Sequence, residues 1–99
     1  MSELDKLEEY LKVQGINYIR IDQNEEKSKD YFQMDRHQII VPEDGPAREW
    51  DAICQKCSYG YEQGLLEIMG TIVDEEKVGD TVEGYLTADD VIQRIEQLF

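Results

Sequence analysis

Basic residues are scarce in this chain of 99 residues, which has 10 Lys and Arg against 23 Asp and Glu and a formal net charge of −13. Such an excess of carboxylates repels nucleic acids and anionic membranes, and it attracts cations and basic protein surfaces. The imbalance is steepest in residues 58–99, which contain 10 acidic residues and only two basic ones, Lys77 and Arg94, for a net charge of −8. The composition therefore argues against a protein that binds nucleic acid or a membrane directly.

Cysteine, histidine and long apolar runs are scarce as well. Two cysteines are too few for a disulfide framework. The longest aliphatic run covers only residues 39–41, and the first residues are acidic where a secretory signal would be basic. We therefore expect a cytoplasmic protein with free thiols.

Motifs of known catalytic or cofactor sites are absent from the sequence. The chain contains no phosphate-binding glycine loop, no Gly-x-Ser-x-Gly elbow and no dinucleotide-binding fingerprint. His37, the only histidine, could pair with a cysteine as half of a thiol hydrolase. Its place in a predicted strand beside Ile39 and Val41 favours a structural role instead. We expect no enzymatic activity and no cofactor.

The apolar pattern predicts one folded α+β domain over residues 1–99. Hydrophobic residues make up 40% of the chain, which is enough for a core. Residues 2–5 have the form of a capping box that begins a helix over 3–14, and Gly15 ends it. A second amphipathic helix is predicted over 47–57, from the spacing of Trp50, Ile53, Cys54 and Cys57. The last helix follows residues 87–90, with one apolar face formed by Val91, Ile92, Ile95, Leu98 and Phe99.

Strands are predicted over residues 16–21, 36–41 and 65–73, and a short edge strand over 82–86. Residues 22–35 and 74–80 are polar and indicate solvated connections. The predicted order is α-β-β-α-β-(β)-α. It corresponds to a small antiparallel sheet of three or four strands packed against three helices.

Cys54 and Cys57 have the CxxC spacing of thiol-disulfide enzymes and of half of many zinc sites. A redox pair needs its nucleophilic cysteine at a helix N-terminus, whereas these residues fall toward the end of the predicted helix. A zinc site needs four ligands, and the chain has no second CxxC. We expect both thiols to be buried and reduced, and a metal or thiol module is the alternative function.

The carboxylates suggest three kinds of site. A calcium loop is a poor match, because residues 22–25 lack the central glycine and terminal glutamate of an EF-hand. A Mg²⁺ nuclease is another poor match, because residues 25–27 and 75–77 lie in polar loops. The third is a surface that imitates nucleic-acid phosphates and binds a basic protein face, with solubility alone as the competing interpretation. The expected partner-binding residues are Asp74, Glu75, Glu76, Asp80 and Glu83.

Several tyrosines are candidates for an aromatic recognition patch. Tyr59, Tyr61 and Tyr85, together with Trp50, belong to residue types that are favoured at interfaces. Scattered packing in the core and at its rim is the alternative interpretation.

Three segments, residues 35–39, 58–70 and 82–91, resemble small acidic proteins of phages and mobile elements of Gram-positive bacteria. The resemblance implies no established activity and no site residue. It does imply a setting in which small acidic proteins bind and block host defence enzymes. The sequence thus predicts a non-catalytic protein that binds a basic surface of a host protein, such as a nuclease or DNA-binding protein. An accessory phage protein of unknown role is the further alternative.

Overall fold

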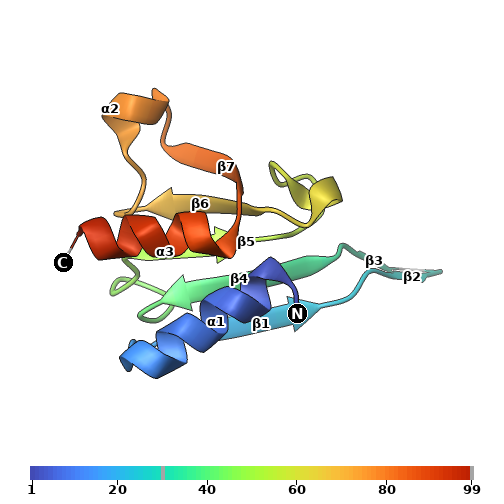
Figure 1. Ribbon diagram of the computed structural model, residues 1–99. Helices are drawn as coiled ribbons and strands as arrows, with labels where there is room; N and C mark the ends of the chain where they lie inside the picture. The colour runs from blue at the N-terminus through green and yellow to red at the C-terminus, as the bar shows by residue number, and fades with distance from the viewer. Residues whose placement is uncertain (30, 99) are drawn as a thin grey trace.

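The computed structural model describes residues 1–29 and 31–98, which form a five-stranded antiparallel sheet with two helices on one face (Figure 1). The helices are α1 (Glu3–Gln14), α2 (Glu75–Val78) and α3 (Ala88–Gln97), with a 3-10 turn η1 (Tyr61–Gln63). The strands are β1 (Ile19–Gln23), β2 (Glu26–Ser28), β3 (Tyr31–Gln33), β4 (Arg36–Val41), β5 (Trp50–Ile53), β6 (Leu66–Gly70) and β7 (Val82–Leu86).

The sheet has the order β1-β4-β5-β6-β7, and a separate two-stranded ladder joins β2 to β3. Every pairing is antiparallel. The predicted α+β class and antiparallel sheet are therefore confirmed. The sheet has five strands rather than three or four, and the predicted element order is wrong in its middle section.

Capping boxes begin both long helices, as the sequence indicates. The Ser2 hydroxyl accepts a hydrogen bond from the Asp5 amide, and the Asp5 carboxylate accepts one from the Ser2 amide. That backbone bond, with help from Arg20, lowers the pKa of Asp5 to about 2. Thr87 and Asp90 form the same reciprocal pair at the start of α3. These bonds satisfy amides that a helix N-terminus otherwise leaves unpaired.

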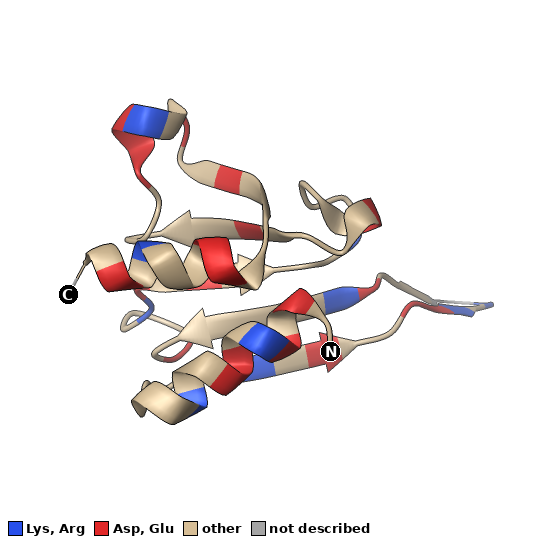
Figure 2. Ribbon diagram, in the orientation of Figure 1, with Lys and Arg blue, Asp and Glu red and all other residues tan. Residues whose placement is uncertain are grey.

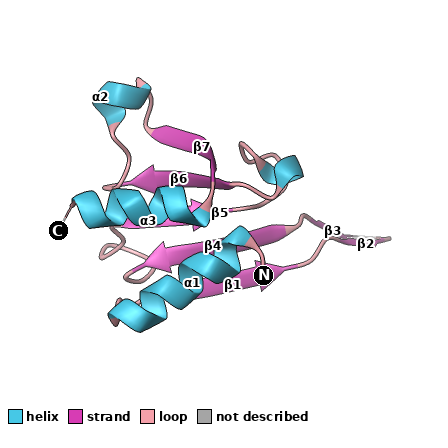
Figure 3. Cartoon of the chain, viewed as in Figure 1, coloured by secondary structure: helices cyan, strands magenta, loops and turns pink. Residues whose placement is uncertain are grey.

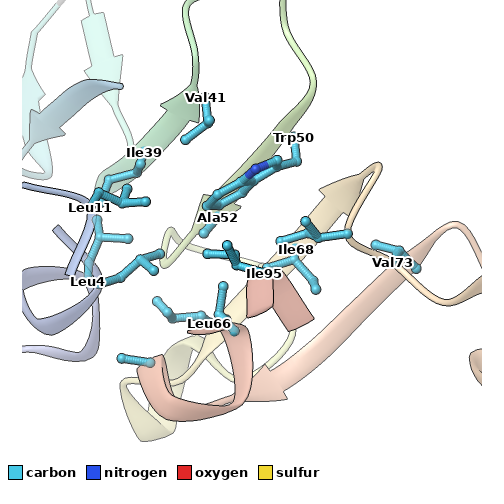
Figure 4. Close-up of a cluster of buried hydrophobic side chains, with 14 residues drawn as sticks. Leu4, Leu11, Ile39, Val41, Trp50, Ala52, Leu66, Ile68, Val73 and Ile95 are labelled. Atoms are coloured by element: carbon cyan, nitrogen blue, oxygen red, sulfur yellow. The ribbon is translucent and has the colours of Figure 1, made fainter. Parts of the chain in front are cut away.

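The core lies between the sheet and the two long helices (Figures 3 and 4). Leu4, Leu7 and Leu11 project from α1, and Val91 and Ile95 project from α3. The strands contribute the residues that face them: Ile39, Val41, Trp50, Ala52, Leu66 and Ile68. Leu98, expected on the apolar face of α3, is 55% exposed, and Phe99 lies outside the described residues.

The predicted helix over 47–57 is wrong, because this segment contains β5 and the turn after it. Trp50 pairs with Val41 and Ala52 with Ile39, so alternate residues of β5 enter the core. Asp51 lies between them and is only 6% exposed, yet it is paired with the Arg48 guanidinium. The Gln38 amide also donates to its carboxylate at 2.8 Å. These partners allow a carboxylate to be buried in a strand.

Residues 22–35, expected to be a solvated connection, contain the whole of a hairpin arm, defined as residues 26–29 and 31–33 with strands β2 and β3. The β2–β3 register continues that of β1–β4, so the two ladders belong to one long hairpin interrupted at 24–25 and 34–35. The arm projects beyond the sheet at one end of the molecule (Figure 1). The β2 residues are all exposed, which removes the apolar alternation that identifies a strand in sequence.

None of the helices in the described part of the chain combines the length and apolar character needed to cross a lipid bilayer.

Candidate partner-binding surface

Arg20 binds three carboxylates where α1 crosses β1. Its Nη1 atom lies 2.8 Å from Asp5 Oδ1 and 3.1 Å from Glu8 Oε1, and its Nε atom lies 2.9 Å from Asp22 Oδ2. Other acidic residues of the N-terminal half are paired similarly, in Lys6–Glu3, Arg48–Asp44, Arg48–Asp51 and Lys56–Glu25. Four of the eight basic residues of this half therefore form ion pairs with local acids among the described residues.

The acidic residues of the C-terminal half lack such partners. Over residues 58–98, the described structure contains one ion pair, between Arg94 and Glu83. The remaining acidic residues there form no ion pair with a side chain, namely Glu62, Glu67, Asp74, Glu75, Glu76, Asp80, Asp89, Asp90 and Glu96. All of these except the half-buried Glu67 are exposed. Figure 2 shows acidic segments on α2, β7 and α3. The uncompensated charge of the molecule is thus concentrated around its last three elements.

A polar groove of about 340 Å³ separates α2 from α3, with β7 as part of its wall. Asp74 and Lys77 line it from the α2 side, and Asp90 lines it from α3. Both aspartates also cap a helix: Asp74 Oδ1 accepts from the Lys77 amide at 3.2 Å, and Asp90 Oδ2 accepts from the Thr87 amide at 2.9 Å. Each of these aspartates retains a second carboxylate oxygen that can accept a hydrogen bond from a binding partner.

The Glu83–Arg94 pair also lines the groove and connects β7 to α3. Arg94 Nη2 donates to Glu83 Oε1, and the two side chains are only 17% and 15% exposed. Within the described residues, Glu83 Oε2 and Arg94 Nη1 have no hydrogen-bond partner. This pair therefore links α3 to the sheet, and it leaves one acceptor and one donor buried without a partner among the described residues.

The structure brings four of the five predicted partner-binding residues to one exposed protrusion. Asp74 caps α2, Glu75 and Glu76 form its first turn, and Asp80 follows in the next turn, all of them exposed. Glu83 differs, because its carboxylate is bound by Arg94. Asp89 and Asp90 were not among the predicted partner-binding residues, because acidic residues at the start of a helix are also explained by helix capping. Only the packing of α3 near α2 places Asp90 in the same groove as Asp74.

The two cysteines of the CxxC pair lie in different environments. Cys57 is exposed, so the prediction that both thiols are buried is wrong for this residue. Cys54 is half-buried against the core, and burial raises its thiol pKa, with a smaller contribution from Asp35. A raised pKa disfavours the thiolate that a nucleophile or metal ligand requires. Among the described residues, no group of three or more His, Cys, Asp and Glu side chains could hold a metal ion.

His37 lies between two carboxylates. Its Nδ1 atom is 2.7 Å from Asp22 Oδ1, and its Nε2 atom is 3.2 Å from Asp35 Oδ1. The hydrogen bond to Asp22 raises the pKa of His37, burial opposes this, and Asp35 adds to the increase. Because both ring nitrogens are occupied, neither is free to accept a proton from Cys54. The imidazole instead joins β1 to β4 and, through the bond from the Tyr61 hydroxyl to Asp35, to η1.

We predict that this bridge weakens at alkaline pH. Folding raises the pKa of His37 above its ordinary 6.5, so its stabilisation is fully present below pH 6.5 and is lost as pH rises through the folded value. His37→Gln should cost about 1 kcal/mol near pH 6 and clearly less near pH 9. Urea unfolding of both proteins across this range measures the difference. A pH-independent difference would contradict a charged bridge.

No family model matches the chain, and neither a curated protein nor a solved structure matches it.

Proposed function

We propose that this protein is a non-catalytic binding protein whose acidic C-terminal half docks on a basic surface of a partner protein. The observation that carries the proposal is the segregation of unpaired charge: one ion pair among the described residues of 58–98, against several in the N-terminal half. A carboxylate already bound to a local cation has little remaining attraction for a partner. The unpaired carboxylates around α2 and α3 retain it.

The partner of this proposal is a nuclease or DNA-binding protein whose basic channel normally holds phosphates. Exposed carboxylates on α2 and the turn after it would take the place of those phosphates, and the groove oxygens of Asp74 and Asp90 would accept donors from lysine or arginine. The resemblance to acidic proteins of phages and mobile elements adds a setting, in which the partner is a host defence enzyme and binding inhibits it. Electrostatic attraction of this kind chiefly accelerates association.

Charge reversal tests the proposal directly. The probe is a fluorescein-labelled peptide of alternating lysine and glycine, and association is followed by stopped-flow fluorescence at low and moderate NaCl. Asp74→Lys, Glu75→Lys and Glu76→Lys together should slow association about tenfold, because they remove the exposed charge of α2. Circular dichroism should still show a folded domain, because loss of the Asp74 cap affects only the four-residue α2, and the exposed changes at Glu75 and Glu76 usually cost under about 0.5 kcal/mol each.

A matched variant separates local charge from net charge. Glu9→Lys, Glu26→Lys and Glu43→Lys change the net charge by the same amount at three exposed, unpaired positions of the N-terminal half. This control should slow association by about threefold or less, since its charges lie away from α2 and are screened over about 10 Å. Equal effects of the two triple variants would show that the acidity acts only through net charge, and the proposal would then be abandoned.

A further inference from the structure

A second pocket, of about 440 Å³, opens at the η1 end of the sheet and has three tyrosines in its wall. Tyr59 and Tyr61 flank Gly60, Tyr61 is the first residue of η1, and Tyr85 belongs to β7. Tyr59 is 58% exposed and Tyr85 is 59% exposed. The structure therefore assembles these three residues of the expected aromatic patch, whereas it buries Trp50 in the core.

The backbone around the pocket is shaped to bring two of the rings together. Tyr85 and Cys57, the two non-glycine residues with positive φ in the described chain, both line this pocket, with φ of 59° and 76°. Such conformations cost free energy and persist only where the surrounding structure holds them, often at functional sites. A Cβ atom on Gly84 would lie 2.3 Å from Tyr59 Cβ, so the Tyr59 loop approaches β7 as closely as a glycine permits.

Tyr59 and Tyr85 form one aromatic platform. Their ring centroids are 6.4 Å apart with an interplanar angle of 32°, which is within the contact range of aromatic pairs. The Tyr85 amide also donates to the Tyr59 carbonyl at 3.3 Å. Tyr61 is oriented by its hydroxyl, which donates to Asp35 at 2.7 Å, and this bond raises its pKa to about 12. The backbone bond and the ring contact therefore hold Tyr59 beside Tyr85.

The charges around the platform favour the binding of a positively charged ligand. Lys56, the basic residue among those that line the pocket, binds Glu25 at 2.9 Å and lies over the Phe32 ring at 5.4 Å, so its ammonium is held by Glu25 and by the hairpin arm. Glu62 lines the same pocket, is exposed and forms no ion pair. Tyrosine faces attract cations, and the planar guanidinium of arginine can stack on a ring while it donates to a carboxylate.

We propose that the Tyr59–Tyr85 platform, with Glu62 beside it, is a binding site for an arginine side chain of the partner protein. This inference rests on the proposed function and adds a residue preference to it. The platform and acidic α2 flank the same edge strand, because α2 and its turn precede β7 and Tyr85 lies near the end of β7. A five-residue strand spans about 17 Å, a distance that one partner surface covers.

Two labelled peptides of equal charge test the site, one alternating arginine with glycine and the other lysine with glycine. Wild-type protein should bind the arginine peptide about fivefold more tightly, as measured by fluorescence anisotropy. Tyr59→Leu with Tyr85→Leu should reduce that preference to about one, whereas the matched Tyr59→Phe with Tyr85→Phe should retain it. Leucine keeps the Cβ contacts and replaces exposed groups, so the fold should survive.

The outcomes distinguish this site from the acidic surface. Reversal of Asp74, Glu75 and Glu76 to lysine should weaken both peptides alike and leave the arginine preference intact. Equal affinity of wild-type protein for the two peptides, or a preference unchanged by the leucine variant, would overturn the arginine site and leave the acidic docking surface standing. Absence of binding to both peptides would overturn both proposals.

Discussion

Replacement of Gly70 by alanine should destabilise the protein by about 3 kcal/mol or more, a large part of the stability of a domain of this size. Gly70 pairs with Trp50 at the β5–β6 ladder and has φ of 106°. An added Cβ would lie 2.4 Å from the Glu49 carbonyl oxygen and 2.7 Å from Trp50 Cα. Backbone atoms cannot rotate away, so the strands must separate and move Trp50, which is 5% exposed in the core.

Gly79→Ala is the matched control. Gly79 also has positive φ, at 74°, but an added Cβ would have no atom within 4 Å. Its replacement should cost about 1 kcal/mol, the usual cost of a left-handed conformation for alanine. Urea unfolding of the two variants measures the difference between them. Equal losses would mean that φ alone, and not the close approach of β5 and β6, requires glycine at Gly70.

Replacement of Arg20 by methionine should cost about 2 kcal/mol. Arg20 is 17% exposed and holds the carboxylates of Asp5, Glu8 and Asp22, which would be left to repel one another where α1 crosses β1. Loss of one partner from a fully buried network costs about 3–5 kcal/mol, and the loss is smaller here because Asp5 and Asp22 are 41% and 49% exposed. Thermal and urea unfolding measure the loss.

Salt identifies the mechanism of that loss. Moderate NaCl screens repulsion between partly exposed carboxylates, so it should raise the melting temperature of the Arg20→Met variant more than that of the wild type. Lys6→Met removes an exposed single pair with Glu3 and should change stability by less than about 0.5 kcal/mol. A salt response equal to that of the wild type would indicate that Arg20 acts through the packing of its stem.

The parts of the fold that sequence predicts well are those specified by neighbours along the chain. Ser2 with Asp5 and Thr87 with Asp90 indicate α1 and α3, because both partners of each cap lie within one turn. Strand β5 has no such local signal. Its buried Asp51 resembles a solvent-facing helical residue until Gln38, 13 residues earlier in the chain, is known to bond it.

The candidate surface also combines features that neighbouring residues specify with features that depend on distant residues. The acidic run from Asp74 to Glu76 is visible in sequence, and its exposure on α2 agrees with what its polarity indicates. The internal role of Glu83 depends on Arg94 in another element, and the aromatic platform depends on contact between Tyr59 and Tyr85, which are 26 positions apart. Charge is read from composition, whereas the pairing of charges and the assembly of rings require the packed structure.

The negative charge of the molecule is unevenly distributed along its length. The hairpin arm carries Lys27 and Lys29 beside Glu26 and Asp30, so its formal net charge is zero, while the unpaired carboxylates gather around α2 and α3. Figure 2 shows basic colour toward the tip of the arm, at the opposite end of the view from α2. Such a separation of charge is a dipole moment, and a positively charged surface exerts a torque on it during diffusion. The protein would therefore approach a basic partner in a preferred orientation, with α2 facing the partner and the arm facing solvent.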